Sequence, residues 1–184
     1  MLDRTLHPNS QTLLSAWQRM NSTDTDIASG PTTRDHPDLV SRLFVMQDVG
    51  EGDWVFRTAG QQLQSYLGRE LADHNFLNFW AGHDRNMLDL LLRTITEERT
   101  PGIVRGRGES LTGERVDIEL ILAPLAQPPH LEGGTRVLGL YQTLGGEAFL
   151  RGRPIWRHRL TAIFPPDSGK CEPRLKLVAN NDID

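Results

Sequence analysis

The chain of 184 residues has one cysteine, Cys171, and two lysines. A single cysteine excludes an internal disulfide framework and a zinc site built on cysteines. No apolar run approaches the roughly 18 residues that a membrane-spanning helix needs, and the first residues lack the basic head and apolar stretch of a secretory signal. We therefore expect a cytoplasmic protein with no membrane segment.

The chain also lacks an excess of positive charge. Its formal net charge is −4, made up of 13 arginines against 19 acidic residues (−6) over residues 1–144 and 7 basic against 5 acidic residues (+2) over residues 145–184. A general nucleic-acid binder needs a basic surface, so nucleic acid is not an expected partner. The basic run 151–159 could bind nucleic acid or an acidic partner, but we favour its packing on the acidic body of the chain.

The length is that of one domain, and local composition divides it into three zones. Residues 1–38 form an N-terminal helix and a linker, residues 39–144 carry the fold, and residues 145–184 form a C-terminal extension. At this length we expect no second, effector domain, and we expect the output of the protein to pass through another protein.

The N-terminal zone contains one amphipathic helix. Four apolar residues recur at the spacing of one helical face, namely Leu13, Leu14, Trp17 and Met20. Asn9 or Ser10 can cap the start of this helix. A short helix beside a loop is not stable by itself, so it must pack on the main domain or on a second copy of the chain. These four residues are the predicted dimerisation surface.

The middle zone predicts an antiparallel sheet with helices on one face. Short apolar or alternating runs predict strands at residues 43–46, 54–56, 103–107, 115–122 and 136–142. Helices are predicted at residues 61–67 and 83–98, with an apolar cluster at residues 76–80 between them. The alternation is clearest at 115–122, where it assigns Asp117 and Glu119 to the solvent face. Hairpin-linked strands around a central group of helices make the fold class α+β.

This order of elements and its motifs resemble a known family. The segments Leu43–Met46, Phe56–Gly60 and Leu67–Leu71 are similar to the alphaproteobacterial PAS_5 family of PAS domains, over residues 13–144. The resemblance implies a PAS fold, which is a five-stranded antiparallel sheet with short helices and one longer helix over one face, plus an N-terminal helix. It also implies a stand-alone sensory or regulatory protein of bacterial signalling. Such a protein would have no catalytic activity and would work through a small-molecule ligand, a partner signalling protein and a homodimer.

The resemblance also indicates residues that would meet a ligand. The arginine after the family's second strand corresponds to Arg57, whose planar guanidinium can bind a carboxylate or phosphate. Pairing of this arginine with a loop acid, Asp73 or Glu70, is the preferred interpretation. Five aromatic side chains are expected around the space between sheet and helices: Tyr66, Phe76, Phe79, Trp80 and Tyr141. Each by itself is ordinary core, and together they could line a cavity for a small apolar or aromatic ligand.

Two cofactors of PAS domains can be weighed against the sequence. Haem needs a ligand such as histidine, and His74 and His83 are the candidates near the start of the 83–98 helix. That position lies near solvent, so haem is not expected. A cysteinyl–flavin photocycle needs a cysteine within the helical middle of the domain, and the place of Cys171 in the extension excludes it. The sequence identifies no other cofactor.

Two alternatives to a ligand-binding sensor stay open. One is a small α+β enzyme with an acid/base pocket, for which Asp73 or His74 would have to be buried beside a second titratable group. The other is a structural PAS module whose core is filled and which binds no ligand. The chain has no nucleophile elbow and no metal-ligand spacing of histidines that would favour the enzyme.

Overall fold

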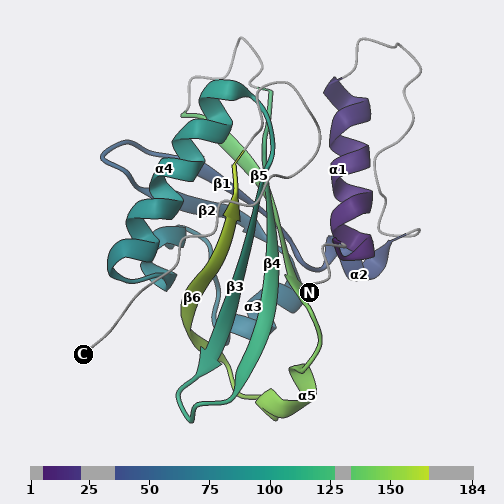
Figure 1. Ribbon diagram of the computed structural model, residues 1–184, viewed down its shortest axis with the longest axis vertical. Helices are drawn as coiled ribbons and strands as arrows, with labels where there is room; N and C mark the ends of the chain where they lie inside the picture. The colour runs from purple at the N-terminus through teal and green to yellow at the C-terminus, as the bar shows by residue number, and fades with distance from the viewer. Residues whose placement is uncertain (1–5, 22–35, 127–133, 166–184) are drawn as a thin grey trace.

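A computed structural model describes residues 6–21, 36–126 and 134–165 as one sheet with helices on both faces (Figure 1). The six strands pair antiparallel in the order β2-β1-β5-β4-β3-β6. The strands are β1 (Leu43–Asp48), β2 (Trp54–Ala59), β3 (Gly102–Ser110), β4 (Arg115–Pro124), β5 (Arg136–Thr143) and β6 (Ile155–Phe164). The helices are α1 (Pro8–Asn21), α2 (Pro37–Val40), α3 (Gln61–Leu67), η1 (Phe76–Phe79), α4 (Gly82–Glu98) and α5 (Glu147–Leu150). The predicted α+β class and antiparallel sheet are confirmed.

The sheet has six strands, so the prediction of five is wrong by one. The additional strand, β6, comes from the C-terminal extension and pairs with β3 at the sheet edge. A register shift makes Trp156 an extra residue in β6, so the exposed Trp156 and Arg157 follow each other directly. Ile155 and His158, on either side of them, are buried. A bulge of this kind removes the two-residue period, which is why the basic run did not predict a strand.

The C-terminal extension therefore packs on the sheet through β6. This agrees with the expectation that its basic run 151–159 packs on the acidic body of the chain. The short alternating run 174–178, which could form one more edge strand, lies outside the described residues. The same is true of Cys171 and of most of the linker predicted between the N-terminal helix and the sheet.

One face of the sheet, here called the inner face, is covered by α3, η1 and α4. The buried stripe of α4 recurs at the helical period and consists of Leu88, Leu91, Leu92 and Ile95. α3 ends at Gly68, whose left-handed φ of 64° suits glycine. Both helices match their predicted ranges to within one residue at each end. Between these helices and the sheet lies the main apolar core.

The opposite face, here called the outer face, is covered by α1 and α2 (Figure 1). A smaller apolar cluster joins these helices to β4 and β5, and its buried members are Leu13, Leu39, Ile121 and Leu140. The N-terminal helix thus packs on the sheet of its own chain.

Two predictions about the outer face are wrong. The helix α1 begins before Asn9, whose backbone N–H donates to Nδ1 of His7 at 3.1 Å, so neither Asn9 nor Ser10 caps its start. Glu119 is fully buried instead of facing solvent. It accepts hydrogen bonds from Arg105 at 2.9 Å and from the backbone N–H of His7 at 3.0 Å. The segment that leads into α1 covers Glu119, a position that the alternation of the strand by itself predicts to be exposed to solvent.

Candidate functional site

Three of the predicted ligand residues, Phe76, Phe79 and Trp80, lie on η1 or directly after it and border the main core. The Phe76 ring stacks on Phe44 with centroids 5.9 Å apart, and Phe79 meets Phe56 edge-on at 6.1 Å. The cavity left between these rings has a volume of about 10 Å³. One water molecule needs roughly 10–15 Å³, so the space between these rings has room for about one water molecule at most.

A buried histidine that sequence analysis did not single out lies beside these rings. His158 of β6 is 2% exposed, and its Nε2 lies 2.9 Å from the hydroxyl of Tyr141. Burial lowers the pKa of His158 to about 4, against a smaller opposite effect of the Phe79 backbone. Burial also raises the pKa of Tyr141. Both side chains are therefore neutral at pH 7 and share one hydrogen bond.

The indole nitrogen of Trp80, Nε1, is buried and has no hydrogen-bond partner among the described residues. The Trp80 ring is a neighbour of His158, with centroids 5.1 Å apart. An indole N–H can only donate. A buried polar group without a partner costs about 1–3 kcal/mol, so this N–H is a donor for which the described fold supplies no acceptor.

A larger hollow of about 570 Å³, here called the groove, opens to the surface beside η1. Its lining comes from the start of β2, the segment 69–81 and β6: Asp53, Val55, Arg69, Asp73, His74, Asn75, Asn78, Phe79, Trp80, Ala81, Trp156 and Arg157. Phe79 and Trp80 also line the small inner cavity. These two rings therefore separate the groove from the buried pair of His158 and Tyr141.

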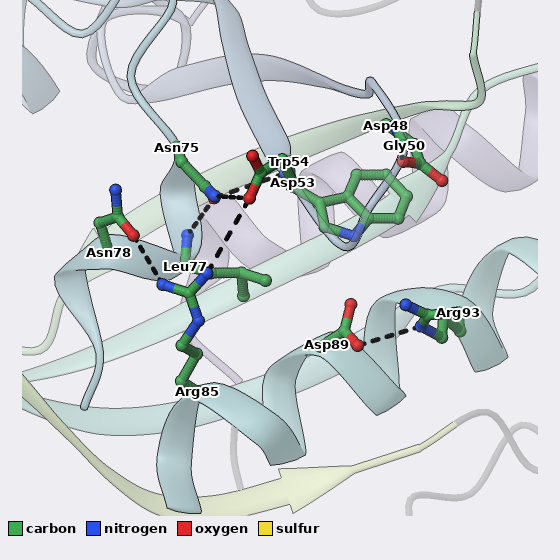
Figure 2. A network of polar contacts seen from close by, with 10 residues as sticks. All are labelled: Asp48, Gly50, Asp53, Trp54, Asn75, Leu77, Asn78, Arg85, Asp89 and Arg93. Carbon is green, nitrogen blue, oxygen red and sulfur yellow. Dashed lines mark hydrogen bonds and ion pairs between the residues drawn. The ribbon is translucent and has the colours of Figure 1, made fainter. Parts of the chain in front are cut away.

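One wall of the groove is a polar network between the β1–β2 turn, η1 and α4 (Figure 2). Asn75 donates to Asp53 at 2.5 Å, and its Oδ1 accepts the backbone N–H of Leu77 at 2.9 Å, which caps η1. Arg85 of α4 donates to Asn78 at 2.6 Å and lies 3.9 Å from Asp53. These contacts fix the orientation of the polar side chains on this wall.

A second wall is built around Arg69. Its guanidinium carbon lies 5.4 Å from the ring centre of Phe79 and 5.7 Å from that of Trp156, in cation–π contact with both. Gly68, directly before it, lies against Pro154 so closely that a Cβ there would come within 2.6 Å of the proline side chain. This close approach of α3 and β6 places Arg69 over Trp156.

Arg57 lines neither the groove nor the inner cavity. It donates to Gln47 at 2.9 Å and to Asp73 at 2.7 Å. This is the pairing with a loop acid that the sequence favours, and it leaves Arg57 with two protein partners at the edge of the sheet.

Tyr66, the fifth predicted aromatic, connects the two faces of the sheet. Its ring centre is 6.3 Å from that of Tyr141, and its hydroxyl lies 3.5 Å from Nη2 of Arg42. Arg42 donates to Oε1 of Gln142 at 3.3 Å, and Asn9 of α1 donates to the same oxygen at 2.9 Å. We call Tyr66, Arg42, Gln142 and Asn9 the cross-sheet bridge.

Three of the four residues predicted for dimerisation contact the chain's own sheet. Leu13 is buried in the outer cluster, and Leu14 packs against it. Trp17 donates its indole N–H to the backbone oxygen of Pro124 at 2.8 Å. Met20 is 60% exposed and faces solvent.

The residues weighed for haem or for acid/base chemistry lie at the surface. His74 and His83 are exposed, and the Asp73 side chain is 80% exposed in its pair with Arg57. Within the described ranges, no three His, Cys, Asp or Glu side chains are grouped so that they could hold a metal ion. None of the helices described is both long and apolar enough to cross a membrane. Among the described residues, His158 and Tyr141 form a titratable pair in which both side chains are buried.

A model of the PAS domain family, PAS_5, matches residues 6–142. Among solved structures, the chain is similar to a light-oxygen-voltage domain studied with a flavin analogue, with 16% identity over 59% of this chain and 83% of that one and a TM-score of 0.43. It is similar to the PAS domain of an HTR-like protein from Haloarcula marismortui, with 17% identity, coverage of 55% and 79%, and a TM-score of 0.43. The LOV protein of Rhodobacter sphaeroides has 16% identity, coverage of 76% and 69%, and a TM-score of 0.44. No curated protein matches the chain.

Proposed function

Because the chain belongs to the PAS domain family, whose model covers residues 6–142, we propose that it is a sensory or regulatory module that binds a small molecule and acts on a partner protein, without catalysis. The groove is the observation that supports this proposal. Its volume of about 570 Å³ lies within the roughly 300–1,000 Å³ of small-molecule sites. Its lining includes Trp80, whose buried Nε1 has no partner among the described residues.

Binding in the groove has a physical route to the rest of the fold. A ligand that touches Phe79 or Trp80 meets rings whose centroids lie 5.9 and 5.1 Å from that of His158. His158 holds Tyr141, and Tyr141 packs on Tyr66, the first member of the cross-sheet bridge to α1. If the arrangement of these rings is coupled to the docking of α1, a ligand that binds one arrangement more tightly changes the fraction of molecules in which α1 is docked on the outer face. The partner protein would meet that surface.

Native mass spectrometry of freshly purified protein and a thermal-shift screen across a metabolite panel test this proposal. We expect a bound mass, or a raised melting temperature with at least one compound. Trp80→Phe is expected to abolish this response because it removes the unpartnered N–H. Trp17→Phe is the matched control, since its indole N–H already has a partner in Pro124. Protein with no bound mass and no thermal shift for any compound would contradict ligand binding.

We also propose a homodimer that forms through the exposed part of α1. Leu13 and Trp17 contact the chain's own sheet, so a charged residue at either position would disturb the fold itself. Met20 is exposed, and Met20→Glu therefore changes the surface without changing the docking of α1. We expect light scattering to give a dimer for the unchanged chain and a monomer for Met20→Glu. The same mass for both would remove α1 as the dimer contact.

A second candidate function is a structural module that binds no ligand. The inner cavity favours it, because a volume of about 10 Å³ leaves no room for an organic molecule between the sheet and the helices. The mass and thermal-shift measurements separate the two functions, since only the sensor responds to a compound.

A further inference from the structure

We propose that the groove binds a small molecule that carries a carboxylate or phosphate, and that Arg69 holds this anion. The inference rests on the ligand-binding function proposed above and adds the charge of the ligand and the residue that recognises it. Three observations carry it: the pairing of the acids in the groove, the stacking of Arg69, and the donors left on the walls.

The two carboxylates that line the groove are already paired with arginines. Asp53 lies 3.9 Å from Arg85 and also accepts an amide hydrogen bond from the neighbouring network. Asp73 accepts from Arg57 at 2.7 Å. The negative charge of the lining is therefore balanced by cations at its border, and it does not oppose an incoming anion.

The Arg69 guanidinium, by contrast, makes no ion pair and no hydrogen bond within the part of the chain that the structure describes. It contacts the rings of Phe79 and Trp156. Contact with an aromatic ring uses a face of the guanidinium and leaves its in-plane N–H groups available. Those groups bind a carboxylate or phosphate through two parallel hydrogen bonds. Because the rings already restrain the side chain, less conformational freedom is lost when the anion binds.

The remaining lining supplies donors and flat apolar surface. Trp80, 4% exposed, has an indole N–H without a partner among the described residues. Asn78 uses its oxygen to accept from Arg85, so its amide N–H groups are the part left for a ligand. Trp156 is 55% exposed and offers a flat ring. This set complements an anion attached to a flat or apolar body, and a hollow of about 570 Å³ fits a small molecule of this kind.

Benzoate and phenyl phosphate test the anion, and benzamide is the neutral match for benzoate. Binding is followed by NMR through the indole N–H signals of the four tryptophans. Trp80 and Trp156 line the groove, whereas Trp17 and Trp54 do not, so the latter two are internal controls. We expect saturable shifts of the Trp80 and Trp156 signals with benzoate or phenyl phosphate. The affinity for benzoate is expected to exceed that for benzamide by roughly tenfold or more, as for a charge-assisted hydrogen-bonded pair.

Variants of Arg69 assign this difference to one residue. Arg69→Ala is expected to remove the advantage of benzoate over benzamide. Arg69→Lys is expected to restore only part of it, because lysine keeps the charge without the planar fork. Arg107→Ala is the matched control, since Arg107 is also exposed but lies on β3 in a pair with Asp117 at 3.2 Å, outside the groove. This control is expected to bind benzoate like the unchanged chain.

Equal binding of benzoate and benzamide, or benzoate binding that survives Arg69→Ala, would overturn the role of Arg69 and leave the ligand-binding function standing. No binding of either anion would overturn the anion inference, and the metabolite screen would then decide separately on ligand binding. Binding of phenyl phosphate alone supports a phosphate ligand, and binding of benzoate alone supports a carboxylate.

Discussion

The two faces of the sheet are covered in different ways. On the inner face, a large apolar core with a group of packed phenylalanine rings joins the sheet to α3, η1 and α4. On the outer face, a cluster of four buried residues joins the sheet to α1 and α2. The N-terminal segment is also bound to the sheet by hydrogen bonds, from His7 to Glu119 and from Asn9 to Gln142.

This difference predicts different local stabilities for the two faces. Local opening requires little free energy where few apolar side chains are buried, and close to the full free energy of unfolding at the main core. We therefore expect the inner face to set the stability of the domain. We expect α1 on the outer face to leave the sheet more readily than the inner helices, while the rest stays folded.

The largest expected effect is the loss of a core ring on the inner face. Phe44→Ala removes a buried side chain that contacts Phe56 and Phe76, and we expect it to lower the free energy of unfolding by about 3–5 kcal/mol. Urea denaturation measures this loss, and hydrogen exchange should show it over the whole sheet. A smaller loss than that of Leu13→Ala on the outer face would reverse the ranking of the two faces.

The second effect is a pH dependence that originates on the inner face. The pKa of His158 is about 4 in the folded chain, against 6.5 for the free side chain. Between these values the unfolded chain binds a proton that the folded chain does not, so stability is complete above pH 6.5 and is lost as the pH falls toward 4. The total corresponds to about 3 kcal/mol. Urea denaturation at a series of pH values measures it.

Two variants isolate the contribution of His158 to this profile. His158→Gln is expected to flatten the profile between pH 6.5 and 4, whereas His83→Gln, at an exposed site, leaves it unchanged. Glu114, whose pKa hydrogen bonds from Ser110 and Thr112 lower from 4.5 to about 2, contributes a loss of stability that begins near pH 4.5 and grows toward pH 2. An unchanged slope in His158→Gln would show that another group titrates in this window.

A third prediction concerns the smaller apolar cluster that binds α1 to the outer face. Leu13→Ala is expected to cost about 2 kcal/mol, at the lower end for a buried leucine, because the cluster around it is small. Hydrogen exchange should then be faster in α1 than in β4 and β5, which keep their protection. Equal acceleration in α1 and in the strands would mean that α1 and the core unfold as one unit.

Local signals were sufficient to predict much of the inner face. The stripe of α4 and the glycine that ends α3 are properties of short segments, and both helices were found where the sequence places them. The pairing of Arg57 with a loop acid was also predictable, since Asp73 lies 16 residues away on the same edge.

The outer face and the groove depend on contacts that no local pattern contains. Glu119 looks exposed in its strand because the backbone that covers it belongs to His7, 112 residues earlier in the chain. β6 was hidden by its bulge, and with it the burial of His158. Arg69 meets Trp156 only because α3 and β6 approach each other in the folded chain. A tertiary contact of this kind leaves no period or spacing in the sequence.

The smallest effect tests whether the two faces are independent. Asn9→Ala removes one hydrogen bond to Gln142 and leaves that of Arg42 in place, so we expect a loss of about 0.5–1.5 kcal/mol. Tyr66→Phe removes the hydroxyl that lies 3.5 Å from Arg42 on the other side of the bridge. If the cross-sheet bridge couples the faces, the double variant departs from the sum of the single ones by about 0.5 kcal/mol or more.

Asn9→Ala combined with Arg93→Ala is the control pair for this cycle, because Arg93 lies on α4 in a pair with Asp89 and has no place in the bridge. Its effects are expected to add. Additivity in the bridge pair as well would show that α1 does not sense the rings of the inner face. A route from the groove to the rest of the sheet would then run through β6, in which Trp156 lines the groove and His158 lines the inner cavity.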